Sequence, residues 1–272
     1  MKAKKAAKVI SQKCLAPGIY DMWLETDLAK EAHAGQFIAV YPKDRSTLLP
    51  RPISICEVKE DGSALRLVYR VAGKGTGEFS TYEAGDETSI LGILGNGYDI
   101  TLAKGKKVFL MGGGIGVPPM LQLAKALYLQ NEEMKKAGAG EEDLTKIQVI
   151  VGYRDSQMFL KEDLEKYAEV YVATEDGSFG AKGNVMNAIE TYGLSADMIC
   201  TCGPMPMLRA IKKYAEEKEI PAYLSLEERM ACGVGACLGC VVKTKEVDHH
   251  SHVNNARICT DGPVFECREV EI

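Results

Sequence analysis

Four cysteines near the carboxyl end of the chain constrain its fold more than any other feature. Cys232, Cys237 and Cys240 lie within nine residues, and Cys259 follows after eighteen intervening residues. A C-x4-C-x2-C series with a distant fourth cysteine is the plant-type ligand spacing for a [2Fe–2S] cluster. The glycines and alanines between the first three cysteines allow the backbone to fold closely around a small inorganic group. We therefore predict that these four cysteines ligate a [2Fe–2S] cluster.

Other interpretations of the cysteines fit less well. A zinc site is disfavoured because zinc knuckles usually pair two C-x2-C units, and only one is present. Buried structural cysteines would not explain three of them in a glycine-rich loop. Cys267 is a second candidate for the fourth ligand, but it lies in a charged, strand-like tail. We assign Cys259, which adjoins a predicted turn.

Charge and hydropathy argue against several classes of function. With a net charge of -5, the chain has no basic excess to attract phosphate backbones, so we expect no nucleic-acid binding. No apolar run reaches the roughly 18 residues that a membrane span requires. The basic start is not followed by the apolar stretch and cleavage site of a signal peptide. We expect a cytoplasmic protein, because an odd total of nine cysteines suits a reducing compartment better than a disulfide framework.

Short apolar runs separated by glycine, proline and aspartate dominate the first hundred residues. Three of these runs are Gln36–Val40, Ile53–Cys56 and Leu65–Tyr69, and turn signals lie at 59–62 and 73–77. Several short strands at such spacing predict a small antiparallel β-barrel.

The pattern changes near residue 104, where longer periodic segments begin. Buried strands are predicted at 107–111, 147–151, 170–173 and 198–201, and helices at 118–130, 161–167, 183–191 and 205–218. Alternating strands and helices predict a doubly wound parallel α/β sheet. Residues 131–145 are expected to form a solvated loop or helix end. The predicted domains are the barrel at 1–101, the α/β domain at 102–222 and a small cluster module at 223–272.

Two glycine-containing loops follow predicted strands of the α/β domain. The first comprises Gly112, Gly113, Gly114 and Gly116, and the second comprises Cys202, Gly203 and Pro204. The first lacks the G-x-G-x-x-G fingerprint, because residue 117 is valine, and alone it could be a simple strand-to-helix turn. Both loops are expected at the carboxyl edge of one sheet, where nucleotides bind, so together they predict a nucleotide site. Cys202 is either a small buried residue or a thiol beside the reacting nicotinamide ring.

A third group of candidate ligand-binding residues lies in the predicted barrel. It comprises Arg51, Pro52, Ile53, Ser54, Val68, Tyr69, Arg70, Gly75 and Thr76. The two arginines are suited to neutralise a pyrophosphate, to which Gly75 and Thr76 are able to donate hydrogen bonds. Tyr69 is suited to stack on a flat ring. Each residue is a weak signal alone, so the prediction depends on the order of the motifs.

That order resembles the ferredoxin–NADP reductase superfamily: R-P-x-S, a tyrosine–arginine pair, a glycine–threonine turn, G-G-G-I-G and C-G-P. Residues 228–237 and the D-G-P-V-F sequence at 261–265 are similar to the electron-transfer subunits of class 1B dihydroorotate dehydrogenase. The resemblance covers nearly the whole chain. The histidine-containing segment 248–252 does not map onto that family, and the region 131–145 is long for it.

The resemblance implies FAD on the barrel, NAD(H) on the α/β domain and a [2Fe–2S] cluster in the tail. It assigns residues 51–54 and 68–70 to the flavin ring, Gly75 and Thr76 to the flavin pyrophosphate, and the four cysteines to the cluster. It also implies an FMN-containing catalytic partner that interconverts dihydroorotate and orotate in pyrimidine biosynthesis, in a heterotetramer with two chains of each kind. Electrons would pass from NADH through FAD and the cluster to the partner, or in reverse when dihydroorotate is oxidised.

Several alternatives stay open at this stage. The small subunit of an NADH-dependent ferredoxin:NADP oxidoreductase or sulfide dehydrogenase contains the same modules. Alternatives from other classes are a redox-sensing iron–sulfur protein and a zinc-bound interaction module. Arg154 and Asp155 offer both a charge for a 2′-phosphate and an acceptor for a 2′-hydroxyl, so they do not decide between NADP and NAD. For His249, His250 and His252 we expect a solvent-exposed loop rather than Rieske-type ligation.

Overall fold

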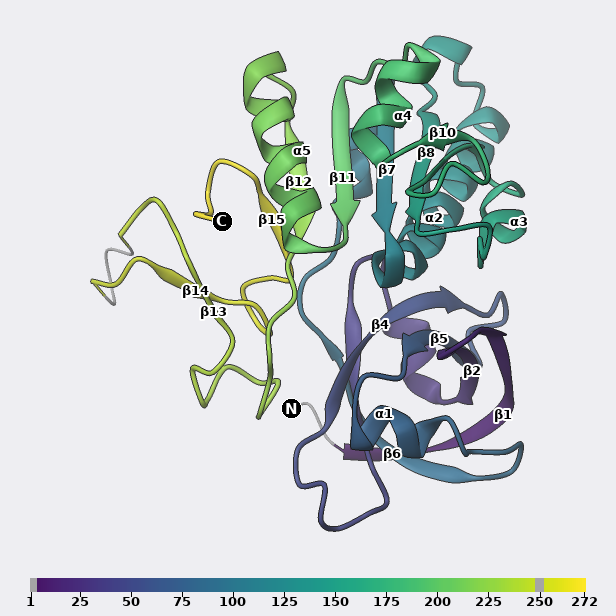
Figure 1. The fold of residues 1–272 in the computed structure, drawn as a ribbon, viewed down its shortest axis with the longest axis vertical. Helices are drawn as coiled ribbons and strands as arrows, with labels where there is room; N and C mark the ends of the chain where they lie inside the picture. The colour runs from purple at the N-terminus through teal and green to yellow at the C-terminus, as the bar shows by residue number, and fades with distance from the viewer. Residues whose placement is uncertain (1–3, 248–251) are drawn as a thin grey trace.

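Residues 4–94 form a closed antiparallel barrel, as the sequence predicts. The computed structural model describes residues 4–247 and 252–272, and the barrel occupies the lower part of Figure 1. The strand order around the barrel is β1-β2-β5-β4-β3-β6. The strands are β1 (Lys4–Ala16), β2 (Ile19–Glu25), β3 (Phe37–Tyr41), β4 (Arg51–Val58), β5 (Ala64–Arg70) and β6 (Glu87–Leu94). Closure pairs the backbone groups that an open sheet would leave at its edges.

Alternating side chains fill the barrel, and part of its outer face packs against helix α2 (Val117–Lys136) and the tail. Met22, Leu24, Ile38 and Leu67 are fully buried in its core. The 73–77 segment, predicted as a turn, instead begins helix α1 (Lys74–Phe79), because the buried ring of Phe79 packs into the same core. Two short 3-10 helices also flank the barrel strands, η1 (Asp27–Glu31) and η2 (Ile100–Ala103).

The second unit is a seven-stranded sheet of order β10-β9-β8-β7-β11-β12-β15, seen in the upper part of Figure 1. Its strands are β7 (Lys107–Gly113), β8 (Lys146–Tyr153), β9 (Glu169–Thr174), β10 (Ala181–Lys182), β11 (Met198–Cys202), β12 (Ala222–Ser225) and β15 (Val264–Glu266). All pairs are parallel except the last, in which β15 runs antiparallel to β12. The reversal of order at β7 is the doubly wound topology that the sequence predicts.

Helices cover both faces of this sheet. They are α2 (Val117–Lys136), α3 (Lys161–Leu164), α4 (Val185–Tyr192) and α5 (Met205–Lys218), with 3-10 helices η3 (Gly114–Gly116) and η4 (Glu141–Asp143). Val108 and Leu110 of β7 pack in one core with α2, whereas Phe109 and Met111 pack in another with α4 and α5. A strand buried on both faces explains the continuous apolar run from which β7 was predicted.

Two helix lengths differ from the prediction. Helix α2 continues to Lys136, six residues beyond the predicted end, because residues 131–136 consist largely of good helix formers. The amide of Asn131 then donates to the carbonyl of Thr145 at 2.8 Å and fastens the connection to β8. Helix α3 covers only 161–164 of the predicted 161–167.

The tail begins and ends in the α/β sheet. After β12 the chain leaves the sheet as an irregular loop, forms the hairpin of β13 (Val241–Lys243) and β14 (Asn255–Arg257), and returns as β15. The register pairs Leu224 with Phe265, so the strands on either side of the cysteine segment are neighbours. The three domain ranges given above stay a prediction; the structure adds that the tail and the α/β domain share one sheet.

A buried charge network joins the barrel to the α/β domain. The Arg66 guanidinium of β5 donates to both carboxylate oxygens of Asp21, at 3.0 and 2.9 Å, and to Glu57 at 3.1 Å. It also donates to Asp163 of α3 at 2.9 Å. Although burial favours the neutral acid, Lys166 and Arg66 hold the pKa of Asp163 below its ordinary value. The contribution of Asp163 to stability is therefore present above about pH 4 and is lost as the pH falls through its lowered pKa.

Removing the cation from this network should destabilise the whole fold. In Arg66→Met, the buried Asp21 loses two guanidinium hydrogen bonds and keeps the ion pair with Lys13 at 3.5 Å, and we expect the free energy of unfolding to fall by about 3–5 kcal/mol. Urea unfolding at neutral pH measures the change. Lys135→Met, which breaks the exposed ion pair with Glu132, is the control and should change stability by less than about 1 kcal/mol. Equal effects of the two substitutions would contradict a structural role for the network.

Candidate functional site

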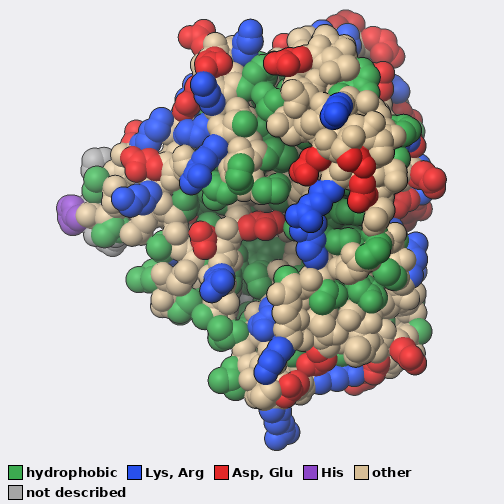
Figure 2. Space-filling model, in the orientation of Figure 1, with side chains coloured by type: hydrophobic (Ala, Val, Ile, Leu, Met, Phe, Trp, Pro, Cys, Tyr) green, Lys and Arg blue, Asp and Glu red, His purple; other side chains and the backbone are tan. Residues whose placement is uncertain are grey.

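An open cavity of about 760 Å³ lies between the barrel and the α/β domain. Figure 2 shows this face of the molecule hollowed between the two units, with basic and acidic side chains around the hollow. The barrel contributes the β1–β2 turn at 16–19 and the end of β5. The α/β domain contributes the loops that follow β7, β8, β9 and β11. The cavity therefore lies at the carboxyl edge of the sheet, where open α/β folds bind ligands.

The structure brings the two predicted glycine loops together on one wall of this cavity. Of their residues, Gly113, Gly114, Gly116, Gly203 and Pro204 line it, while Gly112 is buried in β7. A Cβ at Gly116 would overlap the carbonyl oxygen of Cys202, so only glycine allows the loops to approach so closely. Helices α2 and α5 begin directly after the loops, and helix N-termini favour anionic groups.

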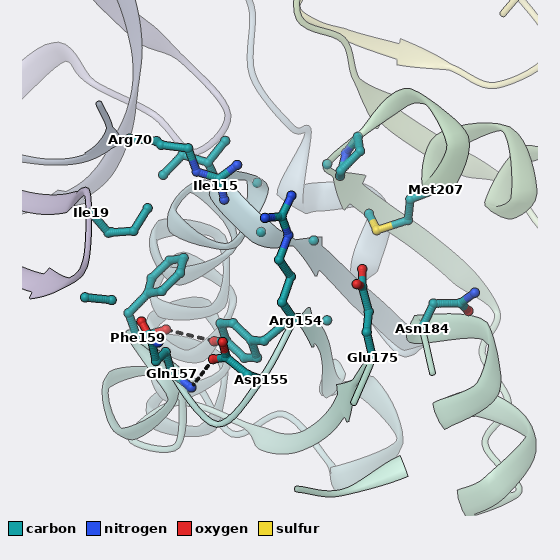
Figure 3. A pocket seen from close by; sticks show the side chains of 18 of the residues that line it. Ile19, Arg70, Ile115, Arg154, Asp155, Gln157, Phe159, Glu175, Asn184 and Met207 are labelled. Atoms are coloured by element: carbon teal, nitrogen blue, oxygen red, sulfur yellow. Dashed lines mark hydrogen bonds between the residues drawn. The ribbon is translucent and has the colours of Figure 1, made fainter. Parts of the chain in front are cut away.

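Two arginines give the cavity a positive charge. Arg70 reaches it from the barrel and lies beside Gly114, and Figure 3 shows Arg154 extending into it from the loop after β8. Within residues 4–247 and 252–272, neither guanidinium forms an ion pair with a carboxylate. Unpaired guanidinium groups beside backbone N–H groups suit a phosphate-containing ligand.

Sequence reasoning missed three polar residues of the cavity. Glu175 follows β9, and Asn184 caps α4 by accepting a hydrogen bond from the N–H of Met186 at 2.9 Å. Glu227 follows β12 and is open to water through the cavity, although protein atoms surround it on most sides. Burial raises the pKa of Glu227, and the charge of Arg70 opposes the shift. Glu175 directly follows a predicted parallel strand, so the sequence could have placed it in the cavity. Glu227 could not be placed from sequence, because its position depends on how the tail folds.

Cys202 is 1% exposed and lies behind the cavity wall rather than on it. Its Sγ is 4.0 Å from a carboxylate oxygen of Glu227, which does line the cavity. Burial, together with the charge of Glu227, raises the pKa of the Cys202 thiol. The thiol is therefore neutral at physiological pH, and Glu227 lies between it and the open space.

Residues 51–54 form the half-buried first half of strand β4. The Arg51 guanidinium donates to the carbonyl of Leu49 at 2.6 Å and packs against Gly75, where a Cβ would come within 2.7 Å of Nε. The Thr76 hydroxyl accepts from the N–H of Ala72 at 2.9 Å, which fixes the start of α1. Segment 51–54 is thus in contact with the Gly75–Thr76 segment, as the predicted flavin site requires.

The three residues from β5 point in different directions. Val68 packs in the core shared with α2, and Tyr69 is buried inside the barrel. The Tyr69 hydroxyl donates to Gln12 at 3.0 Å and its ring stacks on Tyr20, with centroids 6.0 Å apart. Its ring therefore has no free face toward the cavity. Only Arg70 of this trio reaches the cavity.

Four of the five cysteines of the tail form two pairs, and the fifth, Cys267, is buried with its sulfur 3.5 Å from Glu266. In the first, the N–H of Cys237 donates to the sulfur of Cys232 at 3.4 Å, and the Val234 N–H does the same. In the second, the side chains of Cys240 and Cys259 adjoin, and the N–H of Gly235 donates to the Cys259 sulfur at 3.2 Å. The first pair lies nearer to solvent, whereas Cys240 and Cys259 are 2% and 1% exposed. None of these cysteines forms a disulfide.

The environment of Cys232 favours the thiolate form of this residue. Burial would raise the pKa of Cys232, but backbone N–H groups and the Cys237 side chain lower it to about 6. Burial raises the pKa of Cys259 to about 11, with Cys240 adding to the shift. Backbone donors aimed at sulfur are the contacts that stabilise and tune iron–sulfur clusters.

The paired arrangement fits two iron atoms better than one zinc ion. A structural zinc site needs four ligands that converge on one point. Among the residues that the structure describes, no group of three or more His, Cys, Asp or Glu side chains is placed to hold a single metal ion. In a [2Fe–2S] cluster each iron takes two protein ligands, as two cysteine pairs provide. His249 and His250 lie outside the described residues, and His252 is exposed.

Comparison with known proteins agrees with this arrangement. Residues 110–213 match the family model of the oxidoreductase NAD-binding domain. Residues 227–271 match the iron–sulfur cluster binding domain of dihydroorotate dehydrogenase B. A Streptococcus mutans protein described as the electron transfer subunit of dihydroorotate dehydrogenase B (NAD(+)) is 39% identical over 269 residues, which cover 98% of each chain. The chain belongs to this family.

Other comparisons support the same family and fold. A Bacillus pumilus protein with the same description is 38% identical and covers 97% of this chain and 96% of its own. Among solved structures, an NADH-dependent reduced ferredoxin-NADP oxidoreductase has a TM-score of 0.81 at 26% identity, covering 100% of this chain and 91% of its own. A ferredoxin NADP+ reductase from Neisseria gonorrhoeae shares the fold at 16% identity, with a TM-score of 0.63 over 79% of this chain.

Membership in the dihydroorotate dehydrogenase B electron transfer subunits confirms two predictions. The chain is an NAD-linked oxidoreductase subunit, and its tail is an iron–sulfur module. As an electron transfer subunit it acts with a catalytic partner. No helix among the described residues is both long and apolar enough to cross a membrane.

Loss of one cysteine from the exposed pair should remove the cluster and spare the rest of the chain. We expect Cys237→Ala to lose iron and cluster absorbance while it keeps flavin, because Cys237 is exposed in the tail whereas the proposed flavin residues lie on the barrel. Iron analysis and an absorbance spectrum of protein purified without oxygen measure both. Cys14→Ala, which removes an exposed barrel thiol, is the matched control. Loss of both flavin and iron in Cys237→Ala would contradict the prediction that flavin binds independently of the cluster.

Proposed function

We propose that this chain carries electrons between NAD(H) and an FMN-containing dihydroorotate dehydrogenase subunit, through FAD and a [2Fe–2S] cluster. The observation that carries the proposal is the coexistence, in one chain, of a phosphate-suited cavity and a loop with two cysteine pairs. The partner interconverts dihydroorotate and orotate in pyrimidine biosynthesis. The cavity described above suits a dinucleotide, so the chemistry on dihydroorotate belongs to the partner.

The proposed flavin site lies on the barrel. Residues 51–54 line the flavin ring, Arg70 completes the site, and Gly75 and Thr76 lie at the pyrophosphate. The partial exposure of residues 51–54 and the contact of Arg51 with Gly75 support this assignment. Val68 and Tyr69 contribute through the packing of β5, since their side chains are buried.

The proposed nicotinamide nucleotide site is the cavity between the domains. The N–H groups at Gly113, Gly114 and Gly116, and the loop at Gly203 and Pro204, face the pyrophosphate, and helix α2 begins beside it. Gly112 lies within β7, one residue before its end, and pairs with Cys202 of β11. Cys202 backs the wall near the nicotinamide and acts through Glu227, which separates it from the cavity.

The proposed cluster ligands are Cys232, Cys237, Cys240 and Cys259. A flavin held at the barrel site would supply the chemistry that links a two-electron hydride donor to a one-electron acceptor such as the cluster. The chain's own residues position the nucleotide and supply the N–H groups that face the sulfurs. The ranges 1–101, 102–222 and 223–272 are the proposed carriers of the three sites.

We further infer a heterotetramer of two chains of each kind, in the cytoplasm. The family's description as an electron transfer subunit supports a partner chain, and nine unpaired thiols suit a reducing compartment. A second candidate is the small subunit of an NADH-dependent ferredoxin-NADP oxidoreductase, since such a structure covers 100% of this chain. The two candidates differ in partner: an FMN flavoprotein in the first and a subunit with further iron–sulfur clusters in the second.

The deciding experiment is an anaerobic absorbance spectrum of the purified chain, with iron, zinc and released flavin quantified in the same sample. We expect flavin and cluster bands, about two irons per chain, and bleaching on addition of NADH. Co-purification with the FMN subunit then separates the first candidate from the second. A colourless protein that contains zinc would contradict the proposal.

Selection of NADH over NADPH should depend on Glu175. Its carboxylate enters the cavity beside Arg154, where it is able to accept from a ribose hydroxyl and repels a 2′-phosphate. We expect Glu175→Gln to lower the KM for NADPH about tenfold relative to that for NADH, equivalent to about 1.4 kcal/mol. Glu190→Gln, on the exposed face of α4, is the control. An unchanged ratio of KM values would exclude Glu175 from the discrimination.

A further inference from the structure

Asn96 fastens the turn that carries Cys259 to the end of barrel strand β6. Its backbone N–H donates to the carbonyl of Gly262 at 2.7 Å, and its Nδ2 donates to the carbonyl of Asp261 at 2.8 Å. Its Oδ1 accepts from the N–H of Val264 at 3.3 Å. A single barrel residue therefore holds the backbone of the turn at three positions.

The same strand end also touches the loop that follows Cys232. The buried side chain of Leu94 packs over Gly233, where a Cβ would lie 3.2 Å from Leu94 Cδ1. One core joins Leu94 to the buried cysteine pair, Cys240 and Cys259. Strand β6 is thus in contact with the segments that carry both cysteine pairs.

The barrel register connects this contact to the proposed flavin edge. Phe37 of β3 pairs with Ser54 of β4 on one side and with Leu94 of β6 on the other. Adjacent strands lie about 4.8 Å apart, so two spacings, about 10 Å, separate the backbones of Ser54 and Leu94. The proposed flavin face and the cluster loop are therefore joined through three neighbouring barrel strands.

The turn has enough internal bonding to stay folded when Asn96 is replaced. The Arg257 N–H and Nε donate to one carboxylate oxygen of Asp261, at 2.8 and 3.0 Å. The Arg257 guanidinium also reaches the other oxygen at 3.1 Å. Loss of the Asn96 amide therefore loosens the attachment of the turn to the barrel more than the turn itself.

We propose that Asn96 is a positioning residue that sets the separation between the flavin and the cluster. This inference rests on the function proposed above, because it requires both groups to be bound. NADH would supply two electrons to the flavin; one would move to the oxidised cluster, and the second would follow after the partner subunit has taken the first from the cluster. Because electron tunnelling falls steeply with distance, a loosened turn slows this transfer and leaves hydride transfer unchanged.

The test compares Asn96→Ala with Asn131→Ala in otherwise intact chains. Asn131 is a matched control, since its amide also makes two bonds to one backbone, at Thr145, and lies on α2. The flavin is reduced by a light flash with an added photoreductant, and the absorbance of the cluster gives the rate of internal transfer. We expect this rate to fall about tenfold in Asn96→Ala and to stay unchanged in Asn131→Ala. Flavin reduction by NADH, iron content and the cluster's electron paramagnetic resonance spectrum should match the wild type.

Asn96→Asp provides the second variant, because it keeps the acceptor for Val264 but places a carboxylate oxygen against the carbonyl of Asp261 in place of a donor. A slowing at least as large as in Asn96→Ala supports the proposal, and a wild-type rate would contradict it. An unchanged transfer rate in Asn96→Ala would overturn it, as would loss of iron in both variants, which would make Asn96 a requirement for cluster assembly. A wild-type chain without flavin or iron would instead refute the proposed function.

Discussion

Arg66 is a buried cation shared by three carboxylates, two from the barrel and one from helix α3, and it joins the two large units beside the apolar core that the barrel shares with α2. The cavity lies between these units, so its shape follows from their orientation. Arg70 lies four residues further along the same strand and reaches the cavity. Strand β5 therefore both fixes the orientation and supplies a cation to the site.

The cysteine spacing predicted the iron–sulfur module from only a few residues, because three of the four proposed ligands lie close together in one loop. The barrel and the α/β sheet were predictable for a related reason, since apolar periodicity reports burial within each strand or helix. The partners of Arg66 were not predictable, because Asp21 and Asp163 are 45 and 97 residues away along the chain. Such pairings depend on the closed fold.

In the candidate site, too, features of single strands and loops could be predicted from sequence, whereas contacts between distant segments could not. The glycine loops were found from sequence because each follows an apolar strand, and parallel topology brings such strand ends together. Glu227 was missed, because it reaches the cavity only after β12 joins the sheet. The ring of Tyr69 was expected to face a ligand, but in a closed barrel alternate residues of each strand point inward, and Tyr69 is one of them.

The return of the chain as β15 places the two ends of the cysteine-bearing segment side by side, at Leu224 and Phe265. A segment with adjacent ends behaves as an insertion in a sheet that would be continuous without it. The free-energy cost of closing such a loop grows only slowly with its length. The segment is therefore free to lengthen, shorten or be exchanged over evolutionary time with little disturbance to the sheet, and a reductase fold is able to acquire an electron carrier without redesign of its core.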